Sequence, residues 1–278
     1  MSVPRVDHSH PRGQHPARGD TRPPLPLDRL SFSEDGFYLS TFPPFYLSPP
    51  ARINRAPPSN MCGRYTLHHD AKKLARALAL AIPDDYSPDY NIGPGREVLA
   101  IARTEEGTTA RMMHWGLKTP QNFHINARME TVDTAPRFRE SWASHRCLVP
   151  ANGFYEWYAD GVTKKPYYIY PEDRDLAYLA GLWYPADRPG QPATCLLLTT
   201  EAGPPVRQIH HRMPLLLPED LHPDWLSQKL PKAEAIRAAE AVPFAQHPVS
   251  RRVNRVQNND SALIAPATPQ SEDQMMLF

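Results

Sequence analysis

Cys62 has the most distinctive chemistry of any residue in the sequence. It directly follows Met61, and it stands where a proline-rich stretch gives way to alternating strand and helix patterns. If the working chain begins at Cys62, its α-amine and its thiol lie on adjacent carbons. The amine has an ordinary pKa near 7.7 to 8.0 and is partly neutral at physiological pH, and a nearby cation such as Arg64 can lower the pKa of the thiol. Such a pair converts an aldehyde into an imine and then into a five-membered thiazolidine. The alternative for a cysteine within a chain is a small buried hydrophobic residue.

A second polar group comes from residues 125–131. Strand alternation places Asn126, Arg128 and Glu130 on one face of an extended segment. The amide can orient a carbonyl or an amine, and the guanidinium suits a phosphate. The same pattern also fits a solvated edge strand, so the spacing alone leaves both interpretations open.

Glu156 and His210 are the candidates for proton transfer. Glu156 lies among aromatic residues on an otherwise apolar strand, where partial burial raises a carboxyl pKa toward neutrality, although alternation also permits an outward-facing side chain. One of the paired histidines, His210 or His211, can serve as a general acid or base. Adjacent histidines point to opposite faces of a strand and no third ligand follows, so the sequence predicts no metal site and no cofactor.

Arginines and tryptophans recur inside these polar motifs. Together they can form a groove that binds single-stranded nucleic acid by backbone charge and base stacking, although each is individually compatible with an ordinary surface arginine or core tryptophan. The members of this set are Arg64, Arg128, Arg212, Arg251, Arg252, Trp115 and Trp157.

The bulk composition narrows the class of protein. The 278 residues carry a formal net charge of +1, so a polyanion site must be a local patch rather than a property of the whole chain. Three widely spaced cysteines, at positions 62, 147 and 195, exclude a disulfide framework and a structural zinc site and fit the reducing cytoplasm. Neither a signal peptide nor an apolar run of membrane-spanning length is present.

The chain divides into three parts. Residues 1–60 contain 12 of the 33 prolines, which prevent helices and strand ladders from propagating, and we expect a disordered extension there. Three origins compete for it: a start codon assigned too far upstream, a cleaved propeptide, or a regulatory tail. Residues 61–266 are expected to form one domain, and residues 267–278 a flexible tail.

The elements of this domain predict an α+β fold with a curled, barrel-like, mostly antiparallel sheet core and a few flanking helices. Residues 90–95 are predicted as a loop. Strands are predicted at residues 64–67, 98–102, 110–115, 125–131, 147–150, 154–158, 166–170, 176–184, 195–200, 212–217 and 247–253. Helices are predicted from an Asp70 cap to residue 81, from Pro136 in a first turn past Trp142, around residues 224–226, and at 232–241.

The ordered motifs resemble the SRAP family, the SOS-response-associated peptidases. The resemblance implies a sensor of abasic sites in single-stranded DNA that forms a thiazolidine crosslink through an N-terminal cysteine, here Cys62. It further implies that Asn126 positions the amine, Glu156 relays protons, His210 assists sugar ring opening, Arg64, Arg128 and Arg212 hold DNA, and Trp115 stacks near the lesion. The motifs that carry it are residues 61–65, 90–94, 114–117, 126–131, 146–157, 209–214 and 253–264.

Two departures from the family pattern leave alternatives open. The position after His210 is itself a histidine, His211, so either ring could be the one that acts. Sixty residues precede Met61 here, and their retention would block the crosslink, whereas a self-processing thiol peptidase using Cys62 would have them as its substrate. A single-strand binding module with an unreactive cysteine is the third possibility. Under the first hypothesis the protein is a cytoplasmic monomer that meets damaged DNA, with no membrane partner.

Overall fold

The computed structural model describes residues 62–159, 161, 163–186, 188 and 190–267. The predicted extension at residues 1–60 lies outside them, as does the predicted tail except for Ala267. No helix within the described ranges is long and apolar enough to cross a membrane.

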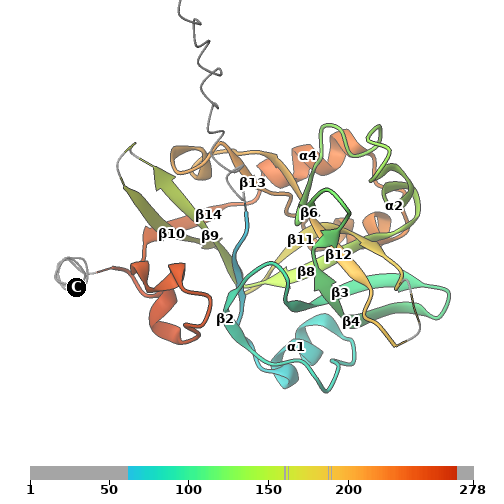
Figure 1. Cartoon of the computed structure of the whole chain (residues 1–278), viewed down its shortest axis with the longest axis horizontal. Helices are drawn as coiled ribbons and strands as arrows, with labels where there is room; N and C mark the ends of the chain where they lie inside the picture. The colour runs from blue at the N-terminus through green and yellow to red at the C-terminus, as the bar shows by residue number, and fades with distance from the viewer. Residues whose placement is uncertain (1–61, 160, 162, 187, 189, 268–278) are drawn as a thin grey trace, which may run out of the picture. The chain divides into compact units, whose positions relative to one another are not determined.

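Two sheets built mainly from antiparallel pairs form the framework (Figure 1). The strands of the first sheet are, in spatial order, β14 (Phe244–Pro248), β10 (Lys164–Pro171), β9 (Gly153–Ala159), β1 (Tyr65–Leu67) and β2 (Asp89–Ile92). The strands of the second sheet are β11 (Ala177–Tyr184), β8 (Arg146–Ala151), β3 (Glu97–Thr104), β4 (Gly107–Trp115), β12 (Thr194–Glu201) and β13 (Arg212–Pro214).

The second sheet curls on itself. Strand β12 pairs in parallel with β4 and in antiparallel fashion with β11, which closes β11, β8, β3, β4 and β12 into a ring. Every residue of β8 is buried, and β11 and β12 are buried except at their ends. Such continuous apolar runs are typical of strands that are covered on both faces. The predicted barrel-like α+β core is therefore confirmed.

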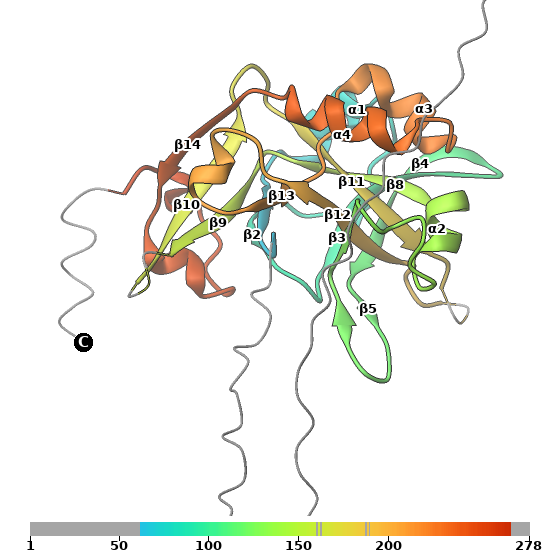
Figure 2. The ribbon, with the colours of Figure 1, turned by 90° about the horizontal axis from the view of Figure 1, so that it is seen from above.

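An excursion from this ring leads into the polar strand β7 (Asn126–Arg128). Strand β4 leaves β12 at Gly116, whose N–H donates to the Cys195 carbonyl, and β7 rejoins the same side of β12, with Asn126 opposite Leu197. Between them a small hairpin of β5 (Leu117–Lys118) and β6 (Phe123–His124) projects on the side from which the blue start of β1 emerges (Figure 2).

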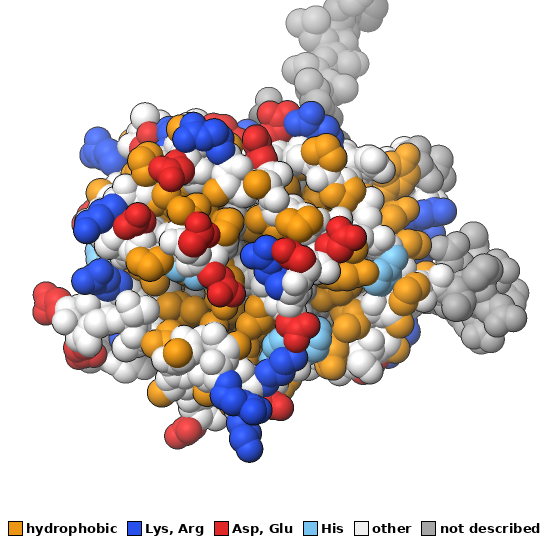
Figure 3. All heavy atoms as spheres, turned by 180° about the vertical axis from the view of Figure 1, so that it is seen from behind, with side chains coloured by type: hydrophobic (Ala, Val, Ile, Leu, Met, Phe, Trp, Pro, Cys, Tyr) orange, Lys and Arg blue, Asp and Glu red, His pale blue; other side chains and the backbone are white. Residues whose placement is uncertain are grey.

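Helices α1, α3 and α4 lie on the other side of the sheets in the same view (Figure 2). The face seen from behind carries acidic and basic side chains intermixed, with no dominant sign (Figure 3). The helices are α1 (Ala71–Leu78), α2 (Arg139–Ser144), α3 (His222–Leu226) and α4 (Lys232–Glu240), with 3₁₀ turns η1 (Val206–Gln208), η2 (Glu219–Leu221), η3 (Arg251–Asn254) and η4 (Ser261–Ile264).

Helix α1 shows how local signals and tertiary context share control. The Asp70 side chain accepts from the Lys73 N–H at 2.7 Å, as predicted for an N-cap. The helix ends at Leu78, before the predicted residue 81, because Ala79 adopts a left-handed conformation with φ of 52°.

Several other predicted boundaries were wrong. The first three residues of the predicted loop at 90–95 belong to strand β2, because β2 pairs with β1, with Ile92 opposite Tyr65. The predicted strand 212–217 is a regular strand only to Pro214, which lacks the N–H that a ladder needs. The predicted strand 247–253 ends at Pro248, and Ser250 then caps the 3₁₀ turn η3. Pro136 precedes helix α2 rather than lying in its first turn.

Candidate active site around Cys62

Cys62 lies three residues before β1, and its backbone nitrogen contacts a buried carboxyl group. The nitrogen donates to Glu156 Oε1 at 2.9 Å. Strand β9 brings Glu156 there, because β9 pairs with β1: Phe154 lies opposite Tyr65, and Gly153 lies opposite Thr66. Cys62 is 2% exposed and Glu156 is 3% exposed. Two residues that are 94 positions apart in sequence are therefore joined inside the protein.

Glu156 is a proton-exchanging group near neutral pH. Burial raises its pKa to about 7, although hydrogen bonds from the side chain and backbone of Cys62 and from the Trp157 backbone oppose the shift. No lysine, arginine or histidine in the described ranges forms an ion pair with it. The inward orientation that alternation left open is therefore the one observed.

The pKa of the Cys62 thiol is raised, whereas the sequence led us to expect that a nearby cation would lower it. Burial raises its pKa well above the ordinary value, the Glu156 charge and hydrogen bond raise it further, and the charge of Arg212 lowers it. The prediction that Arg64 supplies the activating cation was wrong, because the cation that acts on the thiol is Arg212. The thiol is held protonated next to a carboxyl group that can accept its proton.

Arg64 has a structural position. Its Nη1 donates to Asn91 Oδ1 at 2.7 Å and to the Val253 carbonyl at 2.9 Å. Burial lowers its pKa. The Asn91 amide in turn donates to the carbonyls of Val253, Arg255 and Asn258. These bonds tie the start of β1 to the segment after β14 through Nη1 of the guanidinium. The DNA contact of Arg64 stays a prediction.

Trp115 is a core residue. It is fully buried, its Nε1 donates to the Ile125 carbonyl at 3.0 Å, and its ring meets Tyr65 edge to face at 5.4 Å. The stacking role predicted for it is contradicted, because no surface of the indole reaches solvent. Trp115 shares the inward face of β4 with the buried Met113, whereas His114 between them is only partly buried.

Phe123 is the exposed aromatic side chain that the sequence reasoning missed. It is 48% exposed on the β5–β6 hairpin, directly ahead of β7. Its ring covers Gly116, where a Cβ atom would lie 2.2 Å from the ring. Thr119 and Asn122 close the hairpin with mutual hydrogen bonds of 2.8 to 3.0 Å. The signal available in the sequence was an aromatic residue within an otherwise polar turn.

Arg128 and Arg212 border one pocket but differ in their surroundings. The pocket has a volume of about 420 Å³ and is lined by Arg128, Glu130, Thr131, Glu201, His211 and Arg212. Arg128 is exposed, and the described residues offer its guanidinium no hydrogen bond or ion pair. Arg212 is 8% exposed and is bound by Glu130 and Thr199. Arg128 is thus free for a phosphate, whereas the fork of Arg212 is occupied.

His210 is fixed by the backbone of Arg212. Its Nδ1 lies 3.1 Å from both the carbonyl oxygen and the amide nitrogen of Arg212. Burial lowers the His210 pKa, and the charges of His211 and Arg212 lower it further, although its hydrogen bond to the Arg212 carbonyl opposes the shift. The ring is therefore neutral near pH 7, with Nε2 left for proton transfer. His211 is exposed and borders the pocket.

Asn126 lies half-buried on β7, and Arg128 lies exposed on the same strand, because Ala127 between them points into the core. The predicted strand 125–131 is regular only from Asn126 to Arg128, and Glu130 lies in the turn that follows, because the chain leaves β12 after Met129. The role of the Asn126 amide stays a prediction. No group of three or more potential metal ligands occurs among the described residues.

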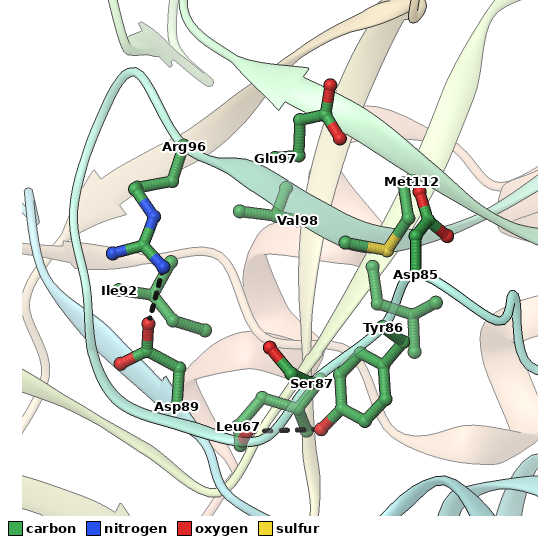
Figure 4. Close-up of a pocket in the computed structure, with 11 residues that line it drawn as sticks. Leu67, Asp85, Tyr86, Ser87, Asp89, Ile92, Arg96, Glu97, Val98 and Met112 are labelled. Atoms are coloured by element: carbon green, nitrogen blue, oxygen red, sulfur yellow. Dashed lines mark hydrogen bonds and ion pairs between the residues drawn. The ribbon is translucent and has the colours of Figure 1, made fainter. Parts of the chain in front are cut away.

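A second pocket, of about 170 Å³, lies near the opposite end of β1 (Figure 4). Asp89 and Arg96 form an ion pair of 3.1 Å there, and the Tyr86 hydroxyl donates to the Leu67 carbonyl at 3.1 Å. None of the predicted site residues borders this pocket. Its polar groups tie the loop after α1 to the sheets.

Comparisons with known proteins place this geometry in context. The family model described as SOS response associated peptidase (SRAP) matches residues 61–256. The abasic site processing protein YedK of Escherichia coli is 33% identical over 224 residues, covering 74% of this chain and 100% of the relative. The abasic site processing protein HMCES of Gallus gallus is 31% identical over 264 residues, covering 74% and 78%.

Solved structures share the fold. A Bacteroides thetaiotaomicron protein superposes with a TM-score of 0.65 at 22% identity, covering 74% of this chain and all of the other. A phage-related protein of Bordetella bronchiseptica gives 0.55 at 29% identity, covering 68% and 94%.

Proposed function

The chain belongs to the SRAP family, and from this premise we propose that it processes abasic sites in single-stranded DNA with Cys62 as its covalent nucleophile. The relatives named above are abasic site processing proteins. An abasic deoxyribose in its ring-opened form presents an aldehyde, which is the electrophile that an aminothiol captures. The proposed product is a thiazolidine that joins Cys62 to the sugar.

The contact between the Cys62 nitrogen and Glu156 is the observation that carries this proposal. In the printed chain the nitrogen belongs to the peptide bond with Met61, and removal of the residues through Met61 converts the same atom into an α-amine. Cys62 also has a φ of 49°, which costs a non-glycine residue about 1 kcal/mol while a preceding residue is attached. The amine would thus be released next to a carboxyl group that is already in hydrogen-bonding position.

The proposed reaction balances with these groups alone. The neutral amine adds to the aldehyde carbon, and the carbinolamine loses water to give an imine. The sulfur then adds to the imine carbon, and the thiol proton ends on the nitrogen of the ring. Glu156, with a pKa near 7, can give a proton to the departing hydroxyl and take one from the thiol.

The other residues have separable proposed roles. His210, neutral and held through Nδ1, assists ring opening through Nε2, and Asn126 orients the amine. Arg128 binds a flanking phosphate, because its exposed guanidinium is free for a bidentate contact. Phe123 takes the stacking role that Trp115 cannot fill, since its exposed ring stands on a closed hairpin beside β7.

Two measurements on the purified chain test the proposal. Intact mass identifies whether the chain begins at Cys62, and incubation with single-stranded DNA carrying one abasic site then reports a covalent, heat-stable adduct. We expect the adduct only with the form that begins at Cys62, with a mass equal to protein plus DNA minus one water. An adduct that forms equally well in Cys62→Ala would contradict the proposal.

A self-processing thiol peptidase is the second candidate. The observation in its favour is that Glu156 contacts the nitrogen of the Met61–Cys62 peptide bond, where it can protonate a leaving amine. Conversion of a chain that begins at Met1 to one that begins at Cys62, abolished in Cys62→Ala, would support it. Binding that is lost in high salt and leaves no adduct would instead indicate a non-covalent single-strand binder.

A further inference from the structure

The Arg212 guanidinium is fixed on two sides. Its Nη1 donates to Glu130 Oε1 at 2.6 Å, and its Nη2 donates to Glu130 Oε2 at 2.9 Å. Nη2 also donates to the carbonyl and hydroxyl oxygens of Thr199, at 2.7 and 3.1 Å. The Arg212 side chain is only 10% exposed and requires such partners, because an unpaired buried charge is strongly destabilising.

The backbone of Glu130 is also held in place, through a hydrogen bond to its carbonyl oxygen. Its carbonyl accepts from Lys232 Nζ at 3.4 Å, and the same ammonium pairs with Asp133 at 2.6 Å. Burial opposes ionisation of the Glu130 carboxyl, but the hydrogen bonds and charge of Arg212 and the charge of Arg128 outweigh it and lower its pKa. Glu130 is therefore an ionised, anchored acceptor at the rim of the pocket.

Arg212 is the residue through which this anchor reaches the reactive groups. Its charge is the cation that lowers the pKa of the Cys62 thiol. Its backbone N–H and carbonyl also lie within hydrogen-bonding distance of His210 Nδ1 and hold that ring in place. A shift of Arg212 would therefore alter both residues, even though Glu130 has no described contact with either.

We propose that Glu130 is a positioning residue: its carboxylate locks Arg212 against β12, which fixes both the cation whose charge acts on Cys62 and the backbone segment that holds His210. This inference rests on the proposed function of Cys62. It also gives the two arginines of the pocket different roles. Arg128 binds a DNA phosphate, whereas the Arg212 guanidinium acts on the reactive groups and is already bound by the Glu130 carboxylate.

The substitution Glu130→Gln isolates this role. Glutamine offers one acceptor oxygen and a repelling NH₂ group to the fork, so one of the bidentate bonds is lost. We expect the guanidinium then to lose its fixed position against Thr199, which weakens the effect of its charge on Cys62. Glu201→Gln is the matched control, because Glu201 borders the same pocket but pairs with Arg207 at 3.0 Å, and it has no assigned role.

The first arm needs no DNA. The chain that begins at Cys62 is treated with iodoacetamide at pH 7.5, and labelling of the peptide that contains Cys62 is followed by mass spectrometry. We expect labelling to slow about tenfold in Glu130→Gln, to recover partly in Glu130→Asp, and to stay within about twofold of the parent in Glu201→Gln. Labelling of Glu130→Gln at the parent rate or faster would overturn the proposal.

The second arm measures crosslinking to abasic single-stranded DNA. We expect the rate at saturating DNA to fall about tenfold in Glu130→Gln, while the half-saturating DNA concentration stays within about twofold. Equal losses in rate and affinity with a lowered Tm would indicate a merely structural residue and overturn the inference. If the variants show the expected labelling rates but the parent forms no crosslink, the proposed function is refuted, whereas the role of Glu130 in positioning Arg212 is retained.

Discussion

Two buried carboxylates flank β1, and their surroundings differ. Asp89, paired with Leu67 at one end, accepts from the Asn91 N–H at 2.6 Å and forms an ion pair with Arg96 (Figure 4). Glu156, at the Cys62 end, contacts the nitrogen and thiol of Cys62 and has no ion-pair partner among the described residues. Both are at most 5% exposed.

The difference teaches that burial of a carboxylate does not by itself mark a reactive site. Asp89 is paired with the Arg96 cation and accepts from the Asn91 N–H, so its charge is compensated and its role is structural. Glu156 lacks a cation, so burial raises its pKa to about 7 and leaves it able to exchange protons. The chemistry is expected where the charge is left uncompensated beside a nucleophile.

The largest expected effect comes from removing the nucleophile at the Glu156 end. Cys62→Ser in a chain that begins at residue 62 should reduce the heat-stable adduct with abasic DNA by about 1000-fold or more, because oxygen replaces the thiolate-forming sulfur. Denaturing gel electrophoresis after a fixed incubation measures it. Asp89→Asn at the other end should keep the adduct, and its loss in that variant would erase the distinction between the two ends.

Removing the proton relay should have the next largest effect. Glu156→Gln keeps an acceptor for the Cys62 nitrogen but cannot exchange a proton, so the rate of crosslink formation should fall about 100-fold. A time course at saturating DNA measures this rate. A rate in Glu156→Gln close to that of the parent would show that the uncompensated carboxylate has no chemical role.

The paired histidines offer a smaller test of the same contrast. His210→Ala should slow crosslinking about tenfold, because it removes the neutral ring that the Arg212 backbone holds in place for proton transfer, whereas His211→Ala should stay within about twofold. The crosslinking rates of both variants are compared at saturating concentrations of the same abasic single-stranded DNA. The opposite ranking would assign the proton transfer to His211.

Stability against pH should also separate the two carboxylates. Between its ordinary pKa of 4.5 and its folded pKa near 7, Glu156 holds a proton in the folded chain that the unfolded chain has lost. In the chain that retains Met61, the free energy of unfolding should therefore fall by about 3 kcal/mol as pH rises through that interval, with the full contribution present below pH 4.5. Urea unfolding at a series of pH values measures it.

Substitutions give this measurement its controls. Glu156→Gln should flatten the profile between pH 4.5 and 7. Asp89→Asn should instead lower stability by about 1 to 3 kcal/mol at pH 7, because Arg96 and the Asn91 N–H lose an ionised partner. A parent profile that is flat across this interval would mean that Glu156 is ionised in the fold.

The smallest expected effect concerns DNA affinity. Arg128→Ala should weaken binding of single-stranded DNA several-fold and reduce the salt slope by about one, because one phosphate contact is lost. Arg64→Ala should leave the slope unchanged, since its guanidinium is engaged by Asn91 and Val253. Fluorescence anisotropy titrations between 50 and 200 mM salt, a range over which such contacts are resolved, measure both slopes.

The sequence by itself determined most of the strands and helices and which neighbouring residues share a strand face. Apolar runs predicted the strands of the closed ring, Asp70 predicted the start of α1, and alternation predicted the shared face of Asn126 and Arg128. These features follow from local periodicity and capping, so they need no knowledge of distant segments.

Only the tertiary structure decided which partner each polar group has. It buried Trp115, engaged Arg64 with Asn91, and gave Arg212 rather than Arg64 the place that acts on Cys62. It also joined Glu130 to Arg212 across 82 positions and Cys62 to Glu156 across 94. The physical reason is that burial and pairing of a charge depend on strand neighbours that are distant in sequence, and a spacing pattern carries no information about them.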